Sequence, residues 1–234
     1  MSSLEQAVHT VMPKKEKNYK KMIKLSNEPT TVFTDLAISF FGFYSANALQ
    51  HLFNATLMGV HKYFSLYFLA IAFSAFFGAL YHAIDPKYRN VRSGLWKITM
   101  IGMIFSLMNM LMATIFYSVP INNNFFKFLQ IIIYFFSFIL TVRIFINDNI
   151  VNAILIYFPS SVIVCMAMIF SWINYNDFAA LQIFIGILIT LFGSSFVITK
   201  ISFHKHFNHN DIFHIFQLIG MYVIFIGSIK IIDN

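Results

Sequence analysis

The sequence predicts an all-α, polytopic membrane protein: a bundle of seven transmembrane helices whose N-terminus is cytoplasmic. Composition supports this, because 59% of the 234 residues are hydrophobic and 11% are charged, whereas about a quarter of a soluble domain is charged. The mean hydropathy is +0.72. Seven apolar runs also reach about 20 residues each, the length at which a helix crosses about 30 Å of hydrocarbon.

The seven predicted spans follow one another without an internal repeat or a second folded domain. In chain order they cover Phe33–Phe53, Tyr63–Ile84, Leu95–Val119, Phe125–Ile146, Ile150–Ile173, Phe178–Ile198 and Ile212–Ile232. Each run is apolar on every face, whereas a barrel strand alternates apolar and polar residues, so helices are expected. The transmembrane domain thus extends over residues 31–234, and residues 1–30 form a basic cytoplasmic tail that we expect to be flexible.

The breaks between the spans carry residues that favour turns. They include Asp85-Pro86-Lys87 after the second span, Pro120 and Asn122-Asn123-Asn124 after the third, Asn147-Asp148-Asn149 after the fourth, and Asn174-Tyr175-Asn176-Asp177 after the fifth. Because these breaks are short, consecutive spans are predicted to pair as helical hairpins.

Positive charges are distributed unequally between the two ends of the predicted bundle. Thirteen lysines and arginines lie in the N-terminal tail or in loops on its side, and three lie on the opposite side. Because cytoplasmic loops carry an excess of lysine and arginine, this asymmetry predicts the cytoplasmic N-terminus. It also accounts for the net charge of +7, so membrane lipid rather than nucleic acid is the expected partner.

Six ionisable side chains stand out because the topology places all of them at the cytoplasmic end of three spans. They are Asp35 in the first span, His82 and Asp85 at the end of the second, and His209, Asp211 and His214 at the start of the seventh. An ionisable group at membrane depth is costly unless it is paired or bound, so such residues usually mark function. Their convergence predicts a functional site beneath the inner leaflet.

Imidazoles with neighbouring carboxylates are donors that a catalytic zinc ion uses, with one position left for water. The candidate zinc ligands are His82, His209 and His214. The candidate catalytic residues, which would orient the water or take its proton, are Asp35, Asp85 and Asp211. The alternative is that each histidine is a hydrogen-bonded structural group at a helix end.

Helical geometry restricts how the last two histidines can meet. Residues five apart point about 140° away from each other, so His209 can join His214 only from a loop or cap before the seventh helix. Asn210 or Asp211 is the expected N-cap of that helix, and simple capping is the alternative role for Asp211.

From Glu28 to the C-terminus, the chain resembles the superfamily of alkaline ceramidases and progestin/adipoQ receptors, in particular a less studied branch without an assigned activity. The residues that carry the resemblance are Glu28-Pro29-Thr30-Thr31, Thr34-Asp35, Gly78-Ala79-Leu80-Tyr81-His82 and His209-Asn210-Asp211-Ile212-Phe213-His214. The resemblance implies a seven-helix frame in which three histidines hold a zinc ion that supports hydrolysis of a lipid amide.

Three departures accompany this resemblance. The superfamily has a serine four residues before the histidine of the second helix, where this chain has Gly78. It spaces the two histidines of the seventh helix by four residues, whereas here the spacing is five and Asn210 occupies the position four before His214. The aspartate that the superfamily carries near the third helix has no clear match.

Two functional hypotheses follow from the sequence. The first is a zinc-dependent hydrolase that acts on a lipid amide or ester. The second is a non-catalytic seven-helix receptor or scaffold whose polar cluster is structural, which the departures favour. A lipid-sized cavity opening at His82 and His214 would distinguish the hydrolase from the scaffold. A transporter is less consistent with the sequence, because the chain lacks repeat symmetry.

Overall fold

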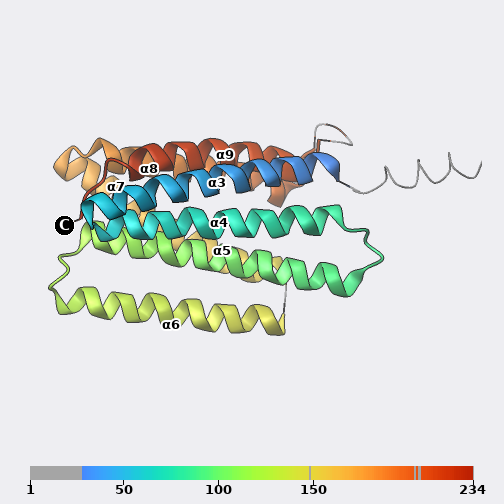
Figure 1. Ribbon diagram of the computed structural model, residues 1–234, viewed down its shortest axis with the longest axis horizontal. Helices are drawn as coiled ribbons and strands as arrows, with labels where there is room; N and C mark the ends of the chain where they lie inside the picture. The colour runs from blue at the N-terminus through green and yellow to red at the C-terminus, as the bar shows by residue number, and fades with distance from the viewer. Residues whose placement is uncertain (1–27, 148, 203, 205–206, 234) are drawn as a thin grey trace, which may run out of the picture.

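The computed structural model describes residues 28–147, 149–202, 204 and 207–233. Most of the predicted tail, residues 1–27, lies outside this part of the chain. The described residues form long α-helices and no strand, apart from an isolated β-bridge between His204 and Phe207. The helices, labelled in Figure 1, are α3 (Pro29–Thr56), α4 (Gly59–Ala83), α5 (Arg89–Ser118), α6 (Asn124–Ile146), α7 (Ile150–Tyr175), α8 (Phe178–Thr199) and α9 (His209–Ser228).

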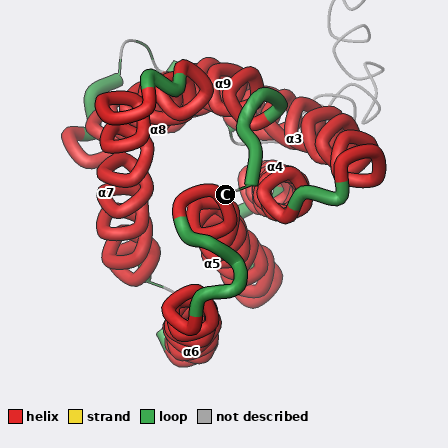
Figure 2. Tube along the Cα trace, turned by 90° about the vertical axis from the view of Figure 1, so that its left-hand side faces the viewer, coloured by secondary structure: helices red, strands yellow, loops and turns green. Residues whose placement is uncertain are grey.

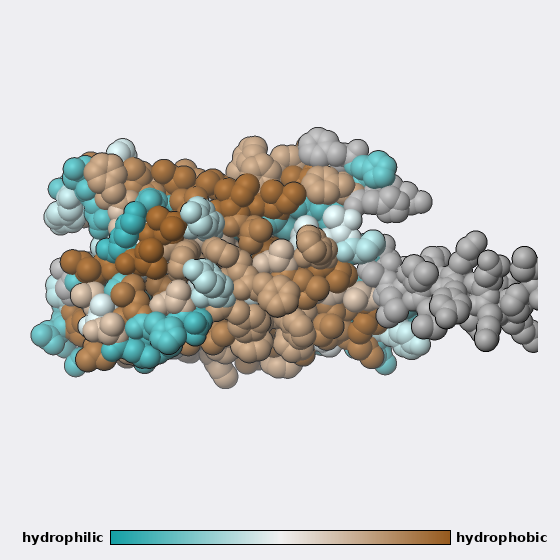
Figure 3. Space-filling view, turned by 45° about the horizontal axis from the view of Figure 1, so that its top comes forward, coloured by the Kyte–Doolittle hydropathy of each residue, from teal (hydrophilic) through white to brown (hydrophobic). Residues whose placement is uncertain are grey.

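All seven helices are long and apolar enough to cross a membrane. They lie alongside one another in an elongated bundle (Figure 1). In the space-filling view, brown apolar atoms cover the middle of the bundle and teal polar atoms gather mainly toward its ends (Figure 3). The predicted all-α architecture with seven apolar helices is thus confirmed.

The helix boundaries differ from the predicted runs at the two ends of the domain. The first helix, α3, begins at Pro29 rather than Phe33, because proline suits the first helical position, where its missing N–H is not needed. The last helix, α9, begins at His209 rather than Ile212. Asn208, not Asn210 or Asp211, is its N-cap, and Asp211 completes a capping box with Asn208.

Short turns join the helices as expected, and polar side chains define several helix starts. Asn123 caps α6 by accepting a hydrogen bond from the backbone N–H of Phe125, and Asp177 caps α8 in the same way. Close approach of α3 and α4 depends on Gly42, where an added Cβ would lie 2.9 Å from the Cβ of Ala72. Small residues of this kind let apolar helices pack tightly within lipid.

The helices pack to different extents around the bundle. The pairs α3–α4, α4–α5 and α8–α9 pack closely, and α9 also contacts α3. Helix α6 lies at the rim, where it contacts α5 and α7 (Figure 2). We call the end of the bundle where α3 and α9 begin the N-terminal face, and the opposite end the C-terminal face. The first turns of α3 and α9 and the last turn of α4 meet at the N-terminal face, which positions the candidate site.

Candidate functional site

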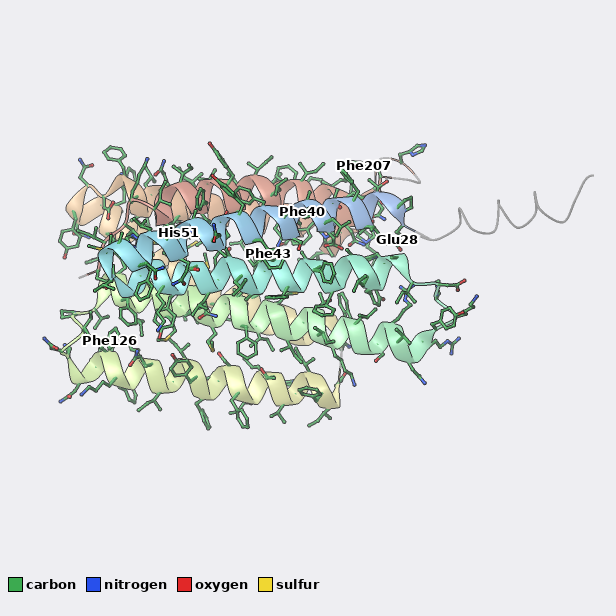
Figure 4. The ribbon with its side chains drawn as sticks, viewed as in Figure 1. Glu28, Phe40, Phe43, His51, Phe126 and Phe207 are labelled. Carbon is green, nitrogen blue, oxygen red and sulfur yellow. The ribbon has the colours of Figure 1, made fainter. Side chains whose placement is uncertain are left out.

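A cluster of polar side chains lies at the N-terminal face, between α3, α4 and α9. We call it the polar cluster; its members are Glu28, Thr31, Thr34, Asp35, His82, Asp211 and His214. Thr31, Asp35, Asp211 and His214 are buried. Glu28 directly precedes α3, beside the end of α4 (Figure 4). The cluster therefore joins segments that are about 180 residues apart in the chain.

His214 is held by two neighbouring residues of α3. Its Nδ1 lies 2.8 Å from the hydroxyl oxygen of Thr34, and its Nε2 lies 3.4 Å from Oδ1 of Asp35. The Thr34 hydroxyl also lies 3.1 Å from the carbonyl oxygen of Thr31; when it donates there, it accepts from Nδ1–H of His214. In that tautomer of the neutral ring, Nε2 carries a lone pair that faces the Asp35 carboxylate, and in the other tautomer Nε2–H donates to the carboxylate.

This pairing has a chemical consequence. When Nδ1 carries the ring proton, the lone pair of His214 Nε2 and an ionised Asp35 oxygen are both acceptors, and two acceptors 3.4 Å apart repel each other. The arrangement is favourable only when a proton or a cation lies between them. The same distance, about 3.4 Å, separates two donors bound at about 2.0–2.1 Å to one tetrahedral zinc ion.

His82 at the end of α4 is oriented by a carboxylate in the same manner. Its Nδ1 lies 2.8 Å from Oε2 of Glu28, and this close contact is the main reason that the pKa of Glu28 is lowered. With Nδ1 engaged, Nε2 is the atom through which the His82 ring would bind a cation.

Asp211 links α9 to α3 and also shapes the start of its own helix. Its Oδ1 accepts from the Thr31 hydroxyl at 2.8 Å, and its Oδ2 accepts from the backbone N–H of Asn208 at 2.8 Å. Both Thr31 and Asp211 have 0% exposure. Capping, the alternative role that the sequence left open for Asp211, is therefore present together with an interhelical bond.

The structure does not bring His209 and Asp85 into the polar cluster. His209 is the first residue of α9, so it points away from His214, five residues later; its Nδ1 lies 3.3 Å from the hydroxyl of Ser202. Helix α4 ends at Ala83, so Asp85 lies in the following turn. The Asp85 side chain is 54% exposed and pairs with Lys87 at 3.5 Å.

Gly78 explains how Asp35 fits against α4. This glycine lies one turn before His82, and a Cβ added there would be 3.2 Å from Oδ2 of Asp35. The missing side chain therefore leaves room on α4 for the carboxylate, which comes from α3.

Three members of the polar cluster were not selected from the sequence as site residues: Glu28, Thr31 and Thr34. Their spacing carried a usable signal, because Thr31, Thr34 and Asp35 are related by three and four residues and share one face of a helix. The signal was missed because the apolar run of this span begins only at Phe33. When the helix is counted from Pro29, Thr31, Thr34 and Asp35 all lie in its first two turns.

The fit of a metal ion to this site is partial. Among the described residues, no three His, Cys, Asp or Glu side chains are arranged as a complete metal-holding group. His214 and Asp35 form a pair with the right separation, and His82 lies at the same end of the bundle. The donor types, two imidazoles and a carboxylate, suit zinc.

Two cavities lie outside the polar cluster. One, of about 570 Å³, lies between α5, α6 and α7 and is almost entirely apolar. The other, of about 320 Å³, lies at the N-terminal face against α4 and α5, and Tyr81 is part of its wall. Neither of these two cavities is lined by His82 or His214.

Comparison with known proteins places the chain in a family. No curated protein matches its sequence. A family described as a family of unknown function, DUF6962, matches residues 30–233. The match includes all seven helices except the first residue of α3. The chain therefore belongs to the DUF6962 family.

Proposed function

We propose that this chain is a multi-pass membrane protein with a cytoplasmic N-terminal face, and that it is a zinc-dependent hydrolase of a lipid amide or ester. One observation carries the proposal: His82 and His214 each engage Nδ1 with a neighbouring oxygen, and Nε2 of His214 faces the Asp35 carboxylate. Metal-binding histidines typically donate their second ring nitrogen to such partners.

His82, His214 and Asp35 are the proposed ligands. Asp35 takes the place that the sequence assigned to His209, because Asp35 lies beside His214 whereas His209 contacts Ser202. Zinc, when bound, acts as a Lewis acid that activates water for attack on a carbonyl group.

The remaining members of the cluster would position these ligands. Glu28 would hold the ring of His82, and Thr34 would hold the ring of His214 through Nδ1. Thr31 and Asp211 hold α3 against α9, so that Asp35 and His214 stay at the same level. Asp211 is thus assigned a positioning role rather than contact with the substrate.

A second candidate function is the non-catalytic receptor or scaffold. One observation favours it: members of the polar cluster already pair with one another. In this case a proton, rather than a metal ion, would lie between His214 and Asp35. The two functions therefore differ in what occupies that 3.4 Å gap.

Metal analysis of the full chain, purified in a neutral detergent without chelators, tests the hydrolase proposal. We expect about one zinc ion per chain, and loss of zinc in His214→Gln and Asp35→Asn. His209→Gln is the matched control and should retain zinc. Thermal unfolding of each variant separates loss of metal from loss of fold.

Zinc-free wild-type protein that unfolds cooperatively would refute the metal site and leave the scaffold. Protein that binds zinc can then be assayed on long-chain N-acyl amides and acyl esters. Turnover that disappears in His214→Gln supports the hydrolase, whereas stoichiometric zinc without turnover on either class supports the receptor or scaffold.

A further inference from the structure

A second site lies at the N-terminal face, where α4 turns into α5. We call it the arginine pocket; it is the cavity of about 320 Å³ lined by Tyr81, Pro86, Arg89, Arg92, Ser93 and Trp96. Its volume lies in the range of small-molecule sites. Its wall combines two guanidinium groups with two aromatic rings.

The sequence builds one wall of this pocket from a single helix face. Arg89, Arg92, Ser93 and Trp96 are separated by three or four residues, so their side chains lie in a row along the first two turns of α5. The turn before them is closed by a hydrogen bond from the backbone N–H of Tyr88 to the carbonyl oxygen of Asp85. This turn brings the row opposite Tyr81 on α4.

The guanidinium group of Arg92 is held in place, but most of its N–H donors make no hydrogen bond to another described residue. Its guanidinium carbon lies 4.3 Å from the centroid of the Tyr81 ring, and Nη1 donates to the carbonyl oxygen of Ile84 at 3.1 Å. A guanidinium has five N–H donors in a planar fork. Tyr81 is in turn packed against Trp96, with ring centroids 5.2 Å apart.

The pocket wall carries two guanidinium groups, and the Glu28 carboxylate lies within electrostatic range of one of them, Arg92. Within the described part of the chain, neither Arg89 nor Arg92 forms an ion pair shorter than 4 Å with a carboxylate. The nearest acidic side chain in the turn, Asp85, pairs with Lys87. The first turn of α5 contains no acidic residue, and the side chain of its N-cap, Tyr88, makes no capping bond. The positive end of the helix dipole therefore adds to the two guanidinium charges.

We propose that the arginine pocket binds the phosphate group of an anionic ligand, as found in a lipid headgroup or a soluble phosphate. Arginine suits this chemistry because its fork binds two phosphate oxygens at once. Tyr81 and Trp96 would pack against the carbon atoms next to the phosphate. Basic pockets between transmembrane helices at headgroup level are known to bind such headgroups.

This site does not depend on the proposed zinc chemistry, although the two are adjacent. The rings of Tyr81 and His82 are in contact, with centroids 5.1 Å apart. A phosphate held by Arg89 and Arg92 would thus lie on the other side of Tyr81 from the polar cluster. If both sites exist, a phosphorylated lipid could be anchored beside His82.

Trp96 provides a direct readout for ligand binding. The chain contains two tryptophans, Trp96 and Trp172, so a Trp172→Phe background leaves Trp96 as the only indole. Full-length protein in a neutral maltoside detergent is titrated with dihexanoyl phosphatidic acid, zwitterionic dihexanoyl phosphatidylcholine or inorganic phosphate. We expect saturable changes in Trp96 fluorescence with phosphatidic acid and much weaker ones with phosphatidylcholine.

Two variants in the pocket and one matched control make the result specific. Arg89 is exposed, so Arg89→Gln should fold normally and raise the Kd for phosphatidic acid about tenfold, as loss of one charged hydrogen bond implies. Arg92→Lys keeps the charge but loses the fork, and should also weaken binding. Arg143→Gln removes the same charge from exposed α6 and should change the Kd by less than about twofold.

The three ligands separate the possible sources of the phosphate. Tighter binding of phosphatidic acid than of inorganic phosphate assigns the site to a lipid headgroup, and equal binding assigns it to a soluble phosphate. Absence of saturable binding to both overturns the proposal. Equal binding of phosphatidylcholine, or an equal effect of Arg143→Gln and Arg89→Gln, also overturns it.

Discussion

The hydrogen bond between Thr31 and Asp211 should make a measurable contribution to the stability of the helix bundle. It joins α3 to α9 at 2.8 Å, and both side chains are completely buried. Thr31→Val removes the hydroxyl but keeps the shape of the side chain. We therefore expect this substitution to destabilise the fold without leaving a cavity.

The expected loss of unfolding free energy follows from the hydrogen bonds that Asp211 loses and keeps in the Thr31→Val variant. A hydrogen bond to a charged group contributes about 1.5–3 kcal/mol in soluble proteins, whereas interhelical bonds between membrane helices average about 0.6 kcal/mol and reach about 1.7 kcal/mol. Asp211 retains the backbone bond from Asn208 to its other oxygen, so the carboxylate is not left entirely without a donor. We expect a loss of about 1–2 kcal/mol.

Thermal unfolding in neutral detergent measures this loss. For a chain of this size, about 1–2 kcal/mol corresponds to a Tm lower by about 2–8 °C. Thr30→Val is the matched control, because it makes the same change at the preceding position, where no side-chain hydrogen bond to Asp211 exists. A double-mutant cycle with Asp211→Asn isolates the pair. Equal effects of the two valine substitutions, or no coupling in the cycle, would refute the reasoning.

Two further predictions concern the ends of α3 and α4. The close contact with His82 holds the pKa of Glu28 below its usual value of 4.5, so the carboxylate stabilises the fold above that pH and the contribution is lost as the pH falls through the lowered pKa of the folded state. Glu28→Gln should therefore flatten the acid side of the Tm profile below pH 4.5; an unchanged slope would contradict this. At the C-terminal face, Asp233 caps α4 by accepting from the backbone N–H groups of Gly59 and Val60 at 2.6 and 2.7 Å. Asp233→Ala should cost about 1 kcal/mol in unfolding free energy, and Asp233→Asn less; an unaltered Tm in the alanine variant would show that the cap is dispensable.

The sequence anticipated the seven helices because the signal for each is local. A run of about 20 apolar residues must be helical in lipid, since every backbone group needs a partner within its own segment. The boundaries were less certain, because caps and first turns are polar. Pro29 begins α3 and Asn208 caps α9; both lie outside the apolar runs, and hydropathy alone does not detect them.

The candidate site was anticipated only in part. Four of its six candidate residues, Asp35, His82, Asp211 and His214, do meet at one face. Asp85 and His209 lie outside the cluster because each is displaced by one feature of local geometry: α4 ends before Asp85, and α9 has already begun at His209. A shift of two or three residues in a boundary rotates a side chain by more than half a turn or moves it off the helix.

By itself, the sequence determined that the chain folds as a bundle of apolar helices and that its six candidate site residues lie at one end. Composition and the order of spans suffice for this, because they set the level at which each residue lies along its helix. Only the tertiary structure decided which side chains touch: Glu28 with His82, Thr34 and Asp35 with His214, and Thr31 with Asp211. These contacts depend on the rotation of each helix about its axis. The packing of α3 against α4 and α9 sets this rotation. The sequence leaves it open, because the runs are apolar on every face.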